Sequence, residues 1–131
     1  MPVELTQVLL AILLAFAQLM LFAVYANLEI GLEFTGGPRD EAPPKEVSKT
    51  TGRMQRAFQN MNETLPWFIG VVVVAHLSNQ VDAVVIAAGW IYLIARLIYV
   101  PVYVIHIGLL RSAVWAVATG AIMVILFKSI F

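Results

Sequence analysis

Four long apolar stretches dominate this chain, and they leave few folds open to it. They cover about residues 8–28, 57–77, 83–105 and 112–131. Each is close to the ~20 residues that an α-helix needs to cross the hydrocarbon core of a bilayer. Apolar and polar residues do not alternate strictly within them, which argues against a transmembrane β-barrel. The stretches therefore predict an all-α integral membrane protein, a bundle of four transmembrane helices.

The composition supports this interpretation. Hydrophobic residues make up 61% of the chain and charged residues only 12%, against about 25% charged residues in ordinary soluble domains. A soluble domain of 131 residues has too much surface to hide so many apolar side chains. We expect a single domain, residues 1–131. The net charge of zero removes the electrostatic basis for binding nucleic acid, and the absence of cysteine excludes disulfides and thiolate metal sites.

The connections between the stretches predict an up-down topology. The second and third stretches are separated by residues 78–82, and the third and fourth by a few residues around Gly108. Short links make consecutive helices antiparallel neighbours. The long connection, residues 29–52, contains Gly-Gly-Pro at 36–38 and Pro-Pro at 43–44, which break regular structure.

The distribution of lysine and arginine predicts an orientation. Five basic residues lie in or beside the long connection, namely Arg39, Lys45, Lys49, Arg53 and Arg56. Arg111 follows the third helix and lies on the same side. The opposite side has Lys128 alone. The positive-inside rule then places the long loop in the cytoplasm and both termini on the other side of the membrane.

Two narrow polar stripes run along the second and third helices. Members of each are spaced three or four residues apart, which keeps them within roughly 80° of one another on a helix. The stripe on the second helix consists of Arg53, Arg56, Asn60, Glu63 and Trp67. The stripe on the third helix consists of Tyr92, Arg96, Tyr99, Tyr103 and His106. Both lie in the cytoplasmic halves of their helices, with Arg111 at the mouth.

Charged side chains inside a membrane are costly and usually mark a functional site. One carboxylate, Glu63, is outnumbered by arginines on its side of the membrane. Arginine binds carboxylates bidentately, so the set suits a small ligand that carries carboxylates. The alternative is that Glu63 pairs with Arg56 or Arg96 and only locks two helices together. Tyr92 lies deepest, and we expect it to pack or to hydrogen-bond between helices. No metal site is expected, because the two histidines lack further ligands.

The stripes also carry a resemblance to a known family. Residues 56–63 read R-A-x-x-N-x-x-E, and residues 95–99 read Ala-Arg-Leu-Ile-Tyr, followed by Tyr103 and then by Arg111-Ser112. With the four spans and the long first loop, the whole chain resembles the MAPEG family, the membrane-associated proteins in eicosanoid and glutathione metabolism. It is most similar to the bacterial branch, which implies location in a bacterial inner membrane.

The resemblance implies a homotrimer that binds glutathione, as cosubstrate, between neighbouring subunits near the cytoplasmic face. The residues that it places in glutathione binding are Arg53, Arg56, Asn60, Glu63, Arg96, Tyr99 and Tyr103. It assigns the catalytic positions to Arg111 and Ser112.

Two positions depart from the family pattern. Thr64 follows the motif glutamate where one mammalian branch has a tyrosine that contacts glutathione. Residues 27–31 contain Glu29 where many of the enzymes have basic residues, one of them proposed to stabilise the thiolate. Arg111 is then the remaining candidate for activating the thiol.

Three functions compete. The leading hypothesis is a glutathione-dependent membrane transferase or peroxidase that acts on lipophilic electrophiles taken from the surrounding lipid. The alternative is a non-catalytic membrane protein of the same fold, a lipid-binding or accessory subunit. A small four-helix exporter is disfavoured, because such a protein needs an acid within its first helix, and here the polar residues are Gln18 and Asn27.

Overall fold

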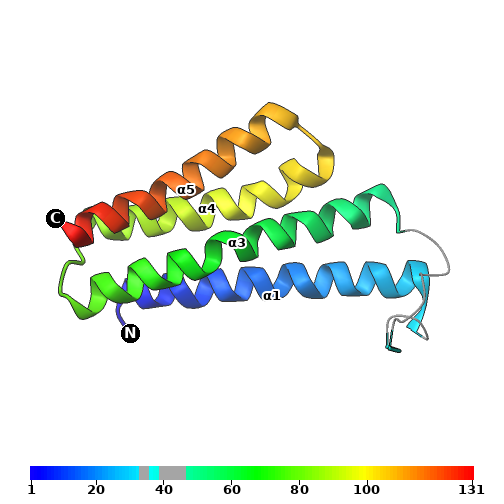
Figure 1. The fold of residues 1–131 in the computed structure, drawn as a ribbon, viewed down its shortest axis with the longest axis horizontal. Helices are drawn as coiled ribbons and strands as arrows, with labels where there is room; N and C mark the ends of the chain where they lie inside the picture. Colours follow the sequence, from blue (N-terminus) through cyan, green and yellow to red (C-terminus); the bar gives the residue numbers. More distant parts are fainter. Residues whose placement is uncertain (33–35, 39–46) are drawn as a thin grey trace.

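The described part of the chain is an antiparallel bundle of four helices. The computed structural model describes residues 1–32, 36–38 and 47–131. Its helices are α1 (Val3–Ile30), α3 (Lys49–Leu77), α4 (Ala83–Ile105) and α5 (Gly108–Ile130). Both termini lie at one end of the bundle, and the end of α1 and the start of α3 lie at the other (Figure 1). The predicted all-helical bundle is thereby confirmed.

Three of these helices are long and apolar enough to cross a membrane, namely α1, α4 and α5. The sequence also predicts a span over residues 57–77, but α3 does not reach the same hydropathy. The reason is its N-terminal half, where Arg53, Arg56 and Glu63 interrupt the apolar residues. The chain is an integral membrane protein, and α3 is the most polar of the four described helices.

Where polar groups cap a helix, the observed helix end differs from the predicted one. Helix α3 begins at Lys49, well before residue 57, because the Ser48 hydroxyl accepts a hydrogen bond from the Thr51 N–H at 3.2 Å. The Glu29 carboxylate accepts bonds from the Ser48 N–H and the Thr51 hydroxyl, both at 2.9 Å. Such caps satisfy orphan donors at a helix start.

The other helix bounds follow the apolar pattern with small shifts. Helix α4 occupies the predicted residues 83–105, whereas α1 extends beyond 8–28 at both ends and α5 begins before residue 112. The loop predicted over residues 29–52 is shorter, because helical residues enter it from both sides. The predicted loop residues 33–35 and 39–46, among them Arg39 and Lys45, lie outside the described residues.

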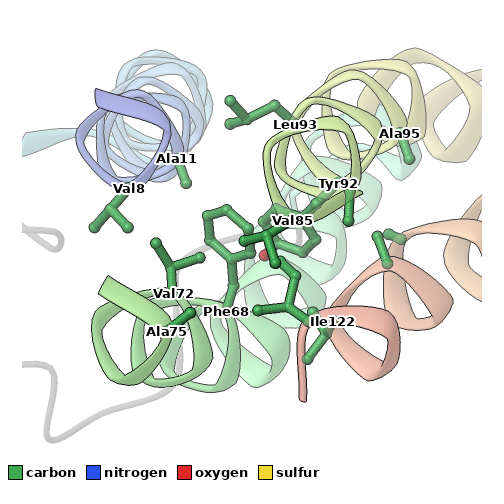
Figure 2. Close-up of a cluster of buried hydrophobic side chains, with 14 of the residues drawn as sticks. Val8, Ala11, Phe68, Val72, Ala75, Val85, Tyr92, Leu93, Ala95 and Ile122 are labelled. Atoms are coloured by element: carbon green, nitrogen blue, oxygen red, sulfur yellow. The ribbon is translucent and has the colours of Figure 1, made fainter. Parts of the chain in front are cut away.

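The core lies where all four helices meet (Figure 2). At its centre the rings of Phe68 and Tyr92 stack with centroids 4.1 Å apart and planes 13° from parallel. The Tyr92 hydroxyl lies 3.0 Å from the hydroxyl of Thr64, which donates to the Met61 carbonyl at 3.2 Å. The expected packing and interhelix hydrogen bond of Tyr92 are confirmed. Thr64, which departs from the family pattern, is buried inside its own subunit.

Polar contacts close the bundle at the end that holds the termini. His76 Nδ1 lies 2.8 Å from a Glu4 carboxylate oxygen, which ties α3 to α1. Lys128 Nζ lies 2.6 Å from an Asp82 carboxylate oxygen, which ties α5 to the start of α4. The hydrogen bond that Asp82 accepts from Lys128, together with the one from the Val85 N–H, holds the pKa of Asp82 below its usual value.

Helices α4 and α5 form a hairpin that is tied at one end and diverges toward the other (Figure 1). The turn between them follows His106, which has left-handed backbone angles (φ 68°) and is exposed. An apolar groove of about 370 Å³ separates the two helices, with Ile98 on one side and Leu110 on the other.

Tyr92→Phe tests the central hydrogen bond. The change keeps the stacked ring and removes the donor to Thr64, so the free energy of unfolding should fall by about 0.6 kcal/mol, the average for hydrogen bonds between membrane helices. Tyr25→Phe, at an exposed tyrosine of α1, is the matched control and should have no effect. Reversible unfolding in mixed micelles measures both. An equal loss in the two variants would show that the Thr64 bond contributes nothing.

Candidate functional site

Arg96 is the centre of the polar site. Its side chain is fully buried, and it is the largest of the fully buried side chains among the described residues. Its Nη1 donates to Asn60 Oδ1 at 2.9 Å, and its Nε approaches Met61 Sδ at 3.3 Å. Its guanidinium carbon lies 4.3 Å from the centre of the Tyr99 ring. All of these contacts are with neutral groups.

Aromatic and guanidinium groups lead in a row from Arg96 to the end of the bundle where α3 begins and α4 ends. The Tyr99 and Tyr103 rings are 5.6 Å apart between centroids. The guanidinium carbon of Arg111 lies 4.8 Å from the centre of the Tyr103 ring, and Arg56 Nε donates to the Tyr103 hydroxyl at 3.2 Å. We call these five residues, Arg56, Arg96, Tyr99, Tyr103 and Arg111, the arginine–tyrosine ladder.

Burial decreases along the arginine–tyrosine ladder. Arg96 and Tyr99 are buried, Tyr103 and Arg111 are half-buried, and Arg56 is exposed. Guanidinium groups on aromatic faces are stabilised by the negative charge of the ring face, so the tyrosines hold the cations without neutralising them. The ladder is therefore a positively charged path from the loop end of the bundle to its interior.

The remaining expected site residues lie around the ladder rather than within it. Arg53 Nη1 donates to the Val104 carbonyl at 3.1 Å, which joins α3 to the end of α4. Asn60 is half-buried against Arg96. Ser112 is exposed at the start of α5.

The carboxylate of Glu63 is exposed in the single subunit. It lies near enough to Arg96 and Tyr99 to interact electrostatically with both. Among the described residues, ion pairs join Glu4 to His76 and Asp82 to Lys128, so the alternative lock between Glu63 and an arginine does not form within one subunit. Arg96 turns to Asn60 and Met61 instead. The expected role of Glu63 in ligand binding stays a prediction.

The sequence analysis does not place two residues in the site, because their residue types are common in ordinary helix packing. Met61 has an apolar side chain, yet its sulfur approaches both Arg96 Nε and the Tyr92 hydroxyl, the latter at 3.9 Å. Thr64 fixes the tyrosine one turn before Arg96 on α4. Their positions on the inner face of α3, opposite the second stripe, are the signal that would have found them.

Glu29, one of the two residues that depart from the family pattern, has a structural role. Its carboxylate holds the first turn of α3 through Ser48 and Thr51. It therefore fixes the end of the helix that carries Arg53 and Arg56, and it contributes no positive charge to the site.

Comparison with known proteins confirms the resemblance over nearly the whole chain. A family model matches residues 7–131, with the description MAPEG family. No curated protein and no solved structure matches the chain significantly. The match covers α3, α4 and α5 entirely, all of α1 except its first four residues, and every residue of the arginine–tyrosine ladder. The chain therefore belongs to the MAPEG family.

Proposed function

We propose that this protein is a glutathione-dependent membrane transferase or peroxidase that acts on lipophilic electrophiles. Membership of the MAPEG family supports a membrane function related to glutathione or eicosanoid metabolism. The finer assignment, to glutathione as cosubstrate and to lipophilic electrophiles as acceptors, is supported by the chemistry of the arginine–tyrosine ladder.

The observation that carries this proposal is the unneutralised positive charge inside the subunit. Arg96 is fully buried among neutral partners, and its Nη2 makes no hydrogen bond with a described residue. A buried charge is costly unless it is paired. A ligand that brings carboxylates would pair it, and glutathione has two carboxylates and one ammonium group. In this assignment the arginines bind the carboxylates and Glu63 binds the ammonium group.

The proposed reaction depends on the thiolate form of the cosubstrate. Positive charge beside a thiol lowers its pKa, and Arg111 at the half-buried end of the ladder supplies that charge. In a transfer, the sulfur forms a bond to an electrophilic carbon while the leaving group departs with its electron pair. In a peroxidase reaction, two thiols become one disulfide while a hydroperoxide becomes an alcohol and water.

One observation favours the non-catalytic alternative. Glu29 occupies the region where many enzymes of the family have a thiolate-stabilising arginine, and it is used to cap α3. Thiol activation then depends on Arg111 alone. If that charge is insufficient, the protein binds its ligand without turning it over, as a lipid-binding or accessory subunit would.

Consumption of glutathione with 1-chloro-2,4-dinitrobenzene distinguishes the two functions. The purified protein should catalyse formation of the sulfur–carbon bond with release of chloride. Arg111→Met should reduce kcat at neutral pH about tenfold for each unit by which the thiol pKa rises, and raising the pH should restore the rate. Lys49→Met, which removes a positive charge at the exposed first residue of α3, is the control and should leave kcat unchanged. A parent protein that binds glutathione and never consumes it would establish the accessory function instead.

Glu63→Gln tests the ligand role of the exposed carboxylate. The change keeps the side-chain shape and removes a charge-assisted bond of about 1.5–3 kcal/mol to the ligand ammonium. The affinity for glutathione should fall roughly ten- to a hundredfold, at about 1.4 kcal/mol per factor of ten.

Isothermal calorimetry measures that affinity, and Asn62→Ala, at the neighbouring exposed residue off the stripe, is the control. An unchanged affinity with a lowered melting temperature would assign Glu63 to subunit packing instead.

We also propose that three copies assemble, with the long loop facing the cytoplasm of a bacterial inner membrane. Arg56 and Glu63 are exposed on α3, and lipid cannot satisfy charged groups within a bilayer. The same helix face continues into an apolar groove of about 500 Å³ between Trp67 and Gly70 of α3 and Ile122 of α5. A neighbouring copy that covers this face would bury both the charges and the groove, and a closed ring of copies satisfies every subunit equally.

Filling the groove tests the assembly. A Cβ atom at Gly70 would meet nothing within 4 Å, so Gly70→Trp leaves the single subunit intact while it blocks the proposed interface. Native mass in detergent should fall from about three times 14.4 kDa to that of one subunit. Gly120→Trp, at an equally open glycine outside this groove, should leave the trimer unchanged. A parent protein that is monomeric and still binds glutathione would contradict the trimer.

A further inference from the structure

Gln18 is a buried polar side chain without a hydrogen-bonding partner among the described residues. It is 6% exposed, and neither its Oε1 nor its Nε2 makes a hydrogen bond with any of them. It lies in the middle of α1, a helix apolar enough to span the membrane. Lipid cannot satisfy an amide at that depth, and an unpaired buried amide costs several kcal/mol in hydrocarbon. Gln18 therefore points to a polar partner inside the bundle.

Two contacts between α1 and α3 fix the level of Gln18 along the bundle. At one end Glu4 contacts His76, and at the other Glu29 contacts Thr51. The two helices are antiparallel and rise equally per residue. Gln18 is fourteen residues after Glu4, so it lies level with the residue fourteen before His76, which is Asn62. This is the segment of α3 that contacts Arg96.

The contacts of Gln7 show which side of α1 Gln18 faces. Gln7 Nε2 donates to the Ile86 carbonyl of α4 at 2.8 Å, and its carboxamide fills the space where a side chain at Gly89 would be. Gln18 follows Gln7 by eleven residues, which is three helical turns to within about 20°. Gln18 therefore faces the same side as Gln7, toward α4.

Arg96 lies on the matching face of α4. It follows Gly89 by seven residues, which is two helical turns to within about 20°. Its guanidinium lies over the Tyr99 ring, at 4.3 Å, so the head group is displaced along α4 toward the level that Gln18 reaches on the parallel helix α1 (Figure 1). Gln18 and the guanidinium thus share both a level and a side.

The two groups are also chemically complementary. Arg96 Nη2 is a buried donor without a partner among the described residues, and Gln18 Oε1 is a buried acceptor in the same condition. A carboxamide oxygen accepts readily from a guanidinium N–H. A hydrogen bond between them would give both the unpaired donor and the unpaired acceptor a partner.

We propose that Gln18 is a positioning residue for Arg96. Its Oε1 accepts a hydrogen bond from Arg96 Nη2, either directly after a small rotation or through one buried water molecule. The guanidinium is then held from α1 as well as from Asn60 and Met61 of α3. Of its five N–H groups, two remain for a carboxylate of the ligand. This last step, and only this step, rests on the proposed function.

Gln18→Glu, combined with Arg96→Met in a double-mutant cycle, tests the link without any ligand. A carboxylate beside the guanidinium gains an ion pair, so Gln18→Glu alone should leave the melting temperature unchanged or raise it. In the Arg96→Met background the same carboxylate has no cation, and it should lower the melting temperature by several degrees. Arg96→Gln is a second neutral background, in which the same loss is expected if Arg96→Met does not fold.

Gln7→Glu is the matched control, because Gln7 is the other buried glutamine on this face of α1. It loses the donor to the Ile86 carbonyl, so it should lower the melting temperature equally with and without Arg96. An equal loss for Gln18→Glu in both backgrounds would overturn the proposal, since the carboxylate would then not sense Arg96.

Ligand binding supplies the second readout. Gln18→Glu should weaken glutathione binding at least tenfold, because its carboxylate competes for the guanidinium, whereas Gln7→Glu should leave the affinity unchanged. If the parent protein does not bind glutathione, the proposed function fails, and the melting-temperature cycle still decides whether Gln18 positions Arg96. The melting temperatures could show coupling between Gln18 and Arg96 while Gln18→Glu binds glutathione as tightly as the parent protein does. That result would overturn the proposal that Gln18 positions Arg96 for the ligand.

Discussion

A single buried cation organises this small bundle. Arg96 is enclosed by groups that stabilise its charge without cancelling it, an amide oxygen, a thioether and an aromatic ring. Two helices must come together to supply them, and the Tyr92 hydroxyl and the Phe68 ring complete the contact one turn deeper. The packing of α3 on α4 and the positive charge that would attract an anion therefore depend on the same side chain.

The sequence predicts the helices and stripes well because both depend on local periodicity. Helix α4 occupies the residues predicted for it, and the spacing of Arg96, Tyr99 and Tyr103 places them in one ladder as expected. The start of α3 could not be predicted from hydropathy, since Glu29 caps it from a helix nineteen residues earlier in the chain.

Helical spacing does not decide which residues of a polar stripe are buried within one subunit. It places Glu63 and Asn60 on one face of α3, but the two side chains have different surroundings. Asn60 turns to Arg96 inside the subunit, whereas Glu63 remains on the surface. Which half faces inward depends on the packing of α4 against α3, through Met61 and Thr64, and these residues have no charge that would mark them in the sequence.

Helices α4 and α5 are joined at both ends of their hairpin. The Asp82–Lys128 ion pair joins them at one end, and residues 106–107 join them covalently at the other. This short link holds the first turn of α5 beside the last turn of α4, so Arg111 stays close to the Tyr103 ring, at 4.8 Å from its centre. Chain connectivity therefore preorganises the outer half of the arginine–tyrosine ladder, and a ligand that binds there meets side chains that are already in place.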